Sequence, residues 1–174
     1  KEIFQGPHVL MTKGMRVTYA DFSVVFRHAI HAFRGPSGDA DILMFLAAVL
    51  DSQLARYYLF HTAPSWGAER PEAFLEDVLR VPFALPDTPG APADAWEIVR
   101  DVAARMRQAL PELQEIVRDR EGITKQLRAT LLPLIYRYYD VDRLEQVLIE
   151  DTLGVSAKSI TPNRGTYRIP SIEP

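Results

Sequence analysis

The chain has 174 residues, of which 47% are apolar, 25% charged and 10% aromatic, and its formal net charge is -3. A chain of this length and composition can bury a core as one ordinary domain, which excludes the disordered and fibrous classes. It has no cysteine, which excludes disulfide scaffolds, thiolate zinc sites and cysteine nucleophiles.

Signals for membrane insertion and export are missing from the sequence. No apolar run reaches the roughly 18 residues of a membrane span. The start, KEIFQGPHVL, has neither an initiating Met nor the apolar core of a signal peptide. We therefore expect a cytoplasmic chain with no membrane partner, cut from a longer polypeptide.

Charge is distributed unevenly along the chain. Residues 1–70 carry seven basic against six acidic side chains, residues 71–151 carry ten against sixteen, and residues 152–174 carry three against one. This balance argues against indiscriminate binding to polyanions, which needs a strongly basic surface. It permits a local basic face that contacts DNA or RNA over a limited footprint.

The first part of the chain predicts three or four antiparallel strands. Apolar residues run together or alternate with period two in three segments, HVLMT (8–12), MRVTYA (15–20) and DFSVVFRHAIHAF (21–33). GPSGD at 35–39 is a turn by composition, and Asp39 or Asp41 then caps a helix over about 40–61. The apolar positions of that helix follow helical spacing: Leu43, Leu46, Leu50, Leu54 and Tyr57.

The middle of the chain predicts less regular structure. A loop follows the helix, and a short helix at 71–78 leads into LRVPFALP at 79–86. Pro82 removes a backbone donor, so a strand there has to lie on a sheet edge or have the proline's missing N–H facing outward. DTPGAPAD at 87–94 is rich in Pro and small residues and marks a linker or boundary.

Beyond this boundary the pattern becomes helical. Six apolar residues are spaced alternately by four and three, as in a short coiled coil, with Pro111 a possible interruption: Val99, Ala103, Met106, Leu110, Leu113 and Val117. Gly122 predicts a helix end, and ITKQLRATLLPLIYRYY restarts the apolar stripe. A last helix follows with Asp140 or Asp142 near its cap and Leu144, Leu148 and Ile149 facing inward.

These elements predict an α+β fold. A small antiparallel or mixed sheet with a packed helix forms residues 1–91, a helical part forms 92–152, and an extended tail forms 153–174. The tail contains three prolines and one strand-like stretch, TYRI.

The sequence offers little support for catalysis. It has no Gly-rich phosphate loop, no G-x-S-x-G and no H-E-x-x-H, and DVDRLE at 140–145 lacks the later residues of a calcium loop. His28 and His31 have a spacing that begins some zinc sites, but on a strand the two rings point to opposite faces, which favours a structural or solvent-facing role. We expect no catalytic and no metal-binding residue.

Basic residues interleaved with polar and aromatic ones suggest a nucleic-acid contact instead. Arginine can bind guanine edges or phosphates, and an exposed Trp can stack on bases. The candidates are Lys13, Arg16, Arg27, His28, His31 and Arg34, with Ser65, Trp66 and Arg70 from the loop at 62–70. Each has an ordinary alternative: Trp66 covers the end of the 40–61 helix, and Arg34 pairs with Asp39 or Asp41.

A family resemblance strengthens this interpretation. The run from Asp41 to Asp87 resembles the C-terminal specificity region of adenine-N6 DNA methyltransferases of restriction-modification systems (type II/IIG-like), in which an L-x-A-x-L-N-S-x-L-x-x-Y-Y helix precedes a loop and a Pro-containing strand. The matching positions here are Leu46, Ala48, Leu50, Asp51, Ser52, Leu54, Tyr57 and Tyr58, then Leu79, Val81, Pro82, Phe83, Leu85 and Pro86. Asp51 stands where the family has Asn. PHVLMTKG, FRHAIHAFRGP and the ending YRYYDVDRLEQVLIEDTLGVSAKSITP look similar to further parts of the same region.

The resemblance implies a target-recognition domain that binds double-stranded DNA, with its catalytic domain upstream in the same polypeptide. The family's S-adenosylmethionine loop and N-P-P-Y-type tetrapeptide are absent from this sequence. The cofactor would therefore belong to the parent enzyme and not to this chain, and the acidic helices would face away from DNA.

Two other classes remain open. A protein-interaction or structural module would use the 99–117 seam to pair with another chain, and its basic residues would be ordinary surface. A self-sufficient enzyme would rest only on scattered His, Asp and Glu.

Overall fold

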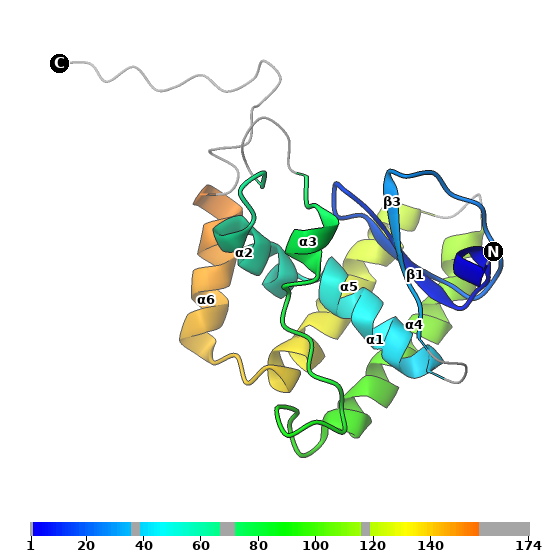
Figure 1. The fold of residues 1–174 in the computed structure, drawn as a ribbon. Helices are drawn as coiled ribbons and strands as arrows, with labels where there is room; N and C mark the ends of the chain where they lie inside the picture. The colour runs from blue at the N-terminus through cyan, green and yellow to red at the C-terminus, as the bar shows by residue number, and fades with distance from the viewer. Residues whose placement is uncertain (1, 36–38, 67–71, 116–118, 157–174) are drawn as a thin grey trace.

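The fold is α+β, with a three-stranded antiparallel sheet packed against helix α1 and a helical region after it, as the sequence predicted (Figure 1). This computed structural model describes residues 2–35, 39–66, 72–115 and 119–156. The strands are β1 (His8–Thr12), β2 (Val17–Ala20) and β3 (Ile30–Phe33). The helices are α1 (Ala40–Asp51), α2 (Gln53–Thr62), α3 (Leu75–Val78), α4 (Ala95–Gln114), α5 (Arg120–Tyr138) and α6 (Arg143–Asp151), with the short turns η1 (Glu2–Phe4) and η2 (Thr152–Ser156) at the two ends.

The sheet has the order β2-β1-β3, so β1 is central and is paired along both of its edges. Val9 and Met11 are fully buried in the main core. The prediction of a strand over the whole of 21–33 is wrong, because only the last four residues pair with β1. Phe22 and Val25 are 55% and 82% exposed, and the segment is held by a hydrogen bond from the Val24 N–H to the Phe4 carbonyl oxygen (2.9 Å).

The turn between β1 and β2 is fastened to the core by Met15. Its φ of 58° lies in the left-handed region, yet its side chain is fully buried. The Met15 N–H donates to the Thr12 carbonyl oxygen (3.0 Å), and the Met15 carbonyl oxygen accepts from Arg56 of α2 (3.5 Å). The orientation of this turn is therefore tied to the helices beneath it.

The predicted helix over 40–61 is two helices, α1 and α2, bent by 58° about Ser52. The buried Ser52 hydroxyl donates to the Val49 carbonyl oxygen (2.6 Å) and accepts from the Ala55 N–H (3.2 Å). It thereby ends α1 and caps α2. No single helix among the described residues is long and apolar enough to cross a membrane, and the bent pair passes that test only when both helices are taken together.

Helix α4 buries the seam that the sequence predicted. Val99 and Ala103 are fully buried, and Met106 is nearly so, where α4 packs against α1 and α5. Leu110 and Leu113 are half-buried, and Pro111 does not end the helix. The seam therefore serves the chain's own core, while Val117 lies outside the described residues.

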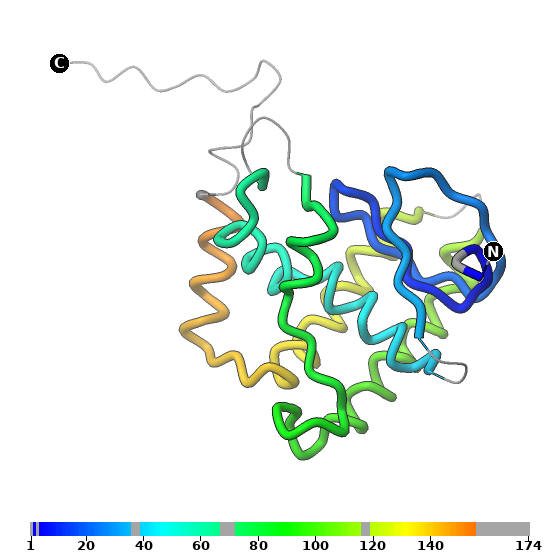
Figure 2. Tube along the Cα trace, in the orientation of Figure 1, coloured from blue at the N-terminus to red at the C-terminus, as the bar shows by residue number. Residues whose placement is uncertain are grey.

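The predicted edge strand at 79–86 is wrong, since these residues form no strand. Their carbonyl groups are bound by side chains instead: the Tyr138 hydroxyl donates to the Ala84 oxygen (2.7 Å) and the Tyr139 hydroxyl to the Pro82 oxygen (2.9 Å). Phe83 packs on Phe45 of α1, with ring centroids 5.9 Å apart. Figure 2 shows this segment, in green, leading from α3 toward the start of α4. The helix predicted at 71–78 is only the four residues of α3.

The last two helices depart from prediction at their ends. Gly122 does not end a helix: it lies in the first turn of α5, where its N–H donates to Asp119 (3.0 Å). Asp142 and Glu145 form a capping box at the start of α6. Ile149 is buried as predicted, but Leu144 and Leu148 are 80% and 55% exposed and do not face inward.

The predicted extended tail at 153–174 begins with a helical turn. Residues up to 156 belong to η2, and the rest, TYRI included, lies outside the described residues.

Candidate functional site

One end of the sheet collects four of the candidate residues. Thr12 pairs with Ile30 and Met11 pairs with Val17, so the β1–β2 turn and the approach to β3 lie at the same end. The turn carries Lys13 and Arg16, and the approach to β3 carries Arg27 and His28. We call these four residues the turn-end cluster.

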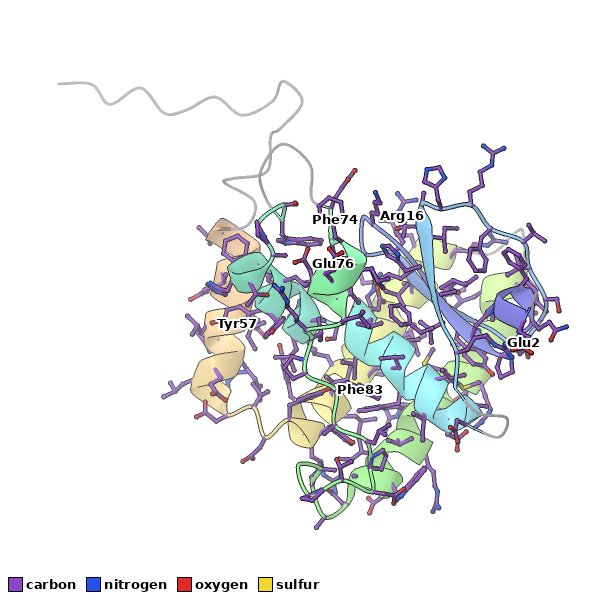
Figure 3. All side chains as sticks on the ribbon, viewed as in Figure 1. Glu2, Arg16, Tyr57, Phe74, Glu76 and Phe83 are labelled. Atoms are coloured by element: carbon purple, nitrogen blue, oxygen red, sulfur yellow. The ribbon has the colours of Figure 1, made fainter. Side chains whose placement is uncertain are left out.

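The turn-end cluster is accessible to solvent. Arg16, Arg27 and His28 are exposed and Lys13 is half-buried. The Lys13 ammonium lies 5.3 Å from the centre of the Phe74 ring, a cation–π distance. Figure 3 shows Arg16 and Phe74 at this same end of the molecule.

The loop after α2 joins the turn-end cluster through the backbone. The Ala73 N–H donates to the Lys13 carbonyl oxygen (2.8 Å), which fastens the far end of the loop to the β1–β2 turn. Ser65 and Trp66 are half-buried, and Trp66 packs against the core. Arg70 lies outside the described residues.

Two candidates are not brought into the cluster. Arg34 is exposed but follows β3 at its opposite end, where Phe33 pairs with Val9. The four residues of β3, each with a rise of about 3.3 Å along the strand, lie between Arg34 and Arg27. His31 lies within β3, half-buried, and its Nε2 has no hydrogen-bond partner among the described residues.

Carboxylates also stand near this end of the sheet. Glu76 of α3 is exposed, and Asp77 is buried, where it accepts from the Phe74 N–H (3.2 Å). At the other end of the sheet, Arg34 pairs with neither Asp39 nor Asp41 within the described residues, and Asp41 instead pairs with Arg107 of α4. The cluster is therefore a local basic patch with acidic neighbours.

A second group of cations, which no sequence motif indicates, is centred on Asp51. This carboxylate accepts two hydrogen bonds from Arg128 of α5 (2.6 and 2.7 Å) and lies 3.6 Å from Arg56 of α2. The hydrogen bonds to Asp51 raise the pKa of Arg128, while burial lowers the pKa of Arg56. Asp51 thus neutralises charge brought together from two helices.

Helix α5 is basic, although residues 71–151 as a whole carry more acidic than basic side chains. It carries four basic side chains, Arg120, Lys125, Arg128 and Arg137, against the single acid Glu121. Three of the four line a cavity of about 820 Å³ that Arg56 and Trp66 line as well. Local sequence could not predict the pairing of Asp51 with Arg128, because the two residues are 77 positions apart and lie on different helices.

A second cavity, of about 510 Å³, lies between α2, α6 and the 79–86 segment. Tyr57, Tyr58, His61, Tyr139 and Glu145 contribute polar groups to it. Tyr139 donates its hydroxyl to Pro82, and burial raises its pKa well above the usual range. Tyr139 and Glu145 in its lining thus already form hydrogen bonds within the fold.

Within the described ranges, no three His, Asp or Glu side chains gather closely enough to hold a metal ion. The chain matches no protein-family model, no curated protein and no solved structure with which it was compared. Function therefore has to be argued from the surfaces themselves.

Proposed function

We propose that this chain is the sequence-specific DNA recognition part of a larger adenine-N6 DNA methyltransferase or restriction-modification enzyme. Its partners are double-stranded DNA and an upstream methyltransferase domain of the same polypeptide. Methyl transfer and S-adenosylmethionine belong to that upstream domain, because the sequence has neither the cofactor loop nor the adenine-holding tetrapeptide.

The observation that carries this proposal is the turn-end cluster. Lys13, Arg16, Arg27 and His28 come from two separate connections, yet the strand register brings them to one end of the sheet. Guanidinium groups bind phosphates and guanine edges in two-pronged fashion, and accessible arginines beside a short loop suit a groove or backbone contact. The resemblance of the 41–87 run supports the same assignment.

An electrophoretic titration of the chain with double-stranded DNA tests the proposal. We expect weak binding that falls steeply as salt rises, because contacts to phosphates release counterions. The double variant Arg16→Ala/Arg27→Ala should lose binding, at about 1–3 kcal/mol for each arginine that contacts a base. A side chain that holds a phosphate should instead weaken all sequences alike.

The matched control is Arg34→Ala, which removes an exposed arginine from the opposite end of β3. It should bind DNA like the unmodified chain. Equal losses in the control and the double variant, or no binding at low salt, would remove the turn-end cluster from the proposal.

A second candidate function is docking on another protein surface through α6. Leu144, Val147 and Leu148 are spaced as one helical stripe and are 80%, 40% and 55% exposed. Such a stripe marks a protein contact more often than an isolated exposed leucine does. It replaces the 99–117 seam as the surface available for such a role, because Val99, Ala103 and Met106 of that seam are packed inside the chain.

Sedimentation at rising protein concentration tests this second candidate for self-association, and Leu144→Glu/Leu148→Glu is the informative variant. Self-association that the variant abolishes would favour the interaction module. A chain that stays monomeric leaves only a heterologous surface, such as the upstream domain, as the partner of α6.

A further inference from the structure

The cavity of about 820 Å³ has an apolar floor. It opens between β2, the junction of α1 and α2, α4 and α5. Ala48 of α1, Met106 and Leu110 of α4, and Leu131 and Ile135 of α5 line it. A cavity of this size, mostly apolar and with few polar groups, is typical of small-molecule sites.

Cations surround this floor. Arg56, Arg120, Lys125 and Arg128 line the cavity, and Asp51 is the one carboxylate among the described residues of its lining. Asp51 is already engaged by Arg128 and lies near Arg56. Arg120 and Lys125 are exposed and form no ion pair within the part of the chain that the structure describes. The wall therefore holds excess positive charge beside apolar surface.

Two of the other polar side chains in the wall, those of Ser52 and Thr18, are already engaged within the fold. The Ser52 hydroxyl donates to Val49, and the Thr18 hydroxyl donates to the Tyr19 carbonyl oxygen (3.3 Å). A sugar or a peptide backbone seated on the floor would leave several of its own polar groups unpaired, which is costly. A ligand with an anionic group joined to an apolar body would pair its charge with the basic side chains and pack its apolar part on the floor.

We propose that this cavity binds an amphipathic organic anion, a carboxylate or phosphate carried on an aliphatic body. The site is separate from the turn-end cluster and does not rest on the DNA-binding function. The charge of the ligand defines its class. A neutral or cationic amphiphile of equal length would cover the same apolar floor, but it would form no ion pair with the basic side chains.

Trp66 provides a direct readout because it lines the cavity, and the chain has only two tryptophans. The other, Trp96, donates to Asp87 (2.6 Å) and is not part of the lining. In a Trp96→Phe background, dodecanoate below its micelle concentration should change the fluorescence of Trp66. Calorimetry should give saturable binding of one molecule per chain. Dodecyltrimethylammonium, with the same tail and the opposite charge, is the ligand control.

Charge-removing variants locate the anionic group. Lys125→Gln and Arg120→Gln should each weaken dodecanoate binding about fivefold, the upper end expected for an exposed ion pair. Arg143→Gln, an exposed arginine of α6 outside the cavity, is the matched control and should bind like the parent. Both test residues are exposed and unpaired in the described structure, so their variants should fold normally.

Three results would overturn the proposal: no binding of dodecanoate, equal binding of the cationic amphiphile, or unchanged affinity in both Lys125→Gln and Arg120→Gln. Vesicles of phosphatidylglycerol separate two sources of the same chemistry. A chain that binds the free acid and sediments with vesicles takes its ligand from a membrane lipid, whereas one that binds only the free acid takes a soluble ligand. None of these outcomes depends on whether the turn-end cluster binds DNA.

Discussion

Helices α4 and α6 have similarly amphipathic sequences, yet they use their apolar stripes differently. Helix α4 places Val99, Val102 and Ala103 fully inside the core, between α1 and α5. Helix α6 buries Ile149 but leaves Leu144 and Leu148 largely in solvent. Periodicity therefore identifies the apolar face of a helix, but it does not say whether the same chain covers that face.

The largest effect that sharpens this comparison is expected from α4. Ile98 is 1% exposed, and Ile98→Ala should lower the free energy of unfolding by about 2–4 kcal/mol, because it removes buried apolar atoms and leaves a cavity. Urea denaturation followed by circular dichroism measures this loss. A cost below about 0.5 kcal/mol would mean that α4 is not the centre of the core.

We expect the protein to lose stability in alkali because of three tyrosines at the end of α5, the helix between α4 and α6 along the chain. Burial raises the pKa values of Tyr136, Tyr138 and Tyr139 above the usual value near 10. The folded state therefore holds these protons more tightly than the unfolded state does. Their contribution is complete below pH 10 and is lost as the pH rises through the folded-state values.

Thermal unfolding at pH 8 to 12 measures this dependence. Tyr139→Phe should make the fall above pH 10 shallower, at the cost of its hydrogen bond to Pro82. An exposed tyrosine would leave the slope unchanged when replaced, so an unaltered slope in this variant would contradict the burial of the Tyr139 ring.

The smallest effect is expected on the exposed stripe of α6. Leu144→Ala should change the free energy of unfolding by less than about 0.5 kcal/mol, because a side chain that is 80% exposed loses little burial. The same urea titration measures it beside Ile98→Ala. A concentration-dependent loss of several kcal/mol would show that a second copy of the chain covers this stripe, and the contrast between the helices would disappear.

Sequence patterns predicted the helices better than the strands, for physical reasons. The period of α4 survives Pro111, and Asp142 was one of the two residues expected near the cap of α6. The segments 21–29 and 79–86 show strand-like sequence, but their backbone groups find partners in Phe4 and in two tyrosine hydroxyls rather than in a neighbouring strand. Such partners lie far away in sequence, and local pattern contains no information about them.

The candidate sites also differ in how far local sequence predicts them. The gathering of Lys13 and Arg16 follows from one hairpin, and Arg27 and His28 join them because β3 begins at that end. Arg34 lies apart because it follows β3, which runs away from the cluster. The cavity with its cations from α2 and α5 depends on the packing of helices separated by more than fifty residues. No sequence motif predicts that packing.

The buried Met15 makes the β1–β2 turn a rigid extension of the interior. A glycine at this position would relax the left-handed backbone, but it would leave a cavity at a fully buried site. The position therefore combines a backbone conformation that favours glycine with a site that needs a large side chain. Substitutions deep beneath the turn should consequently tilt Lys13 and Arg16 without touching them. Variants that change what this end of the molecule recognises can thus arise at positions that no partner ever contacts.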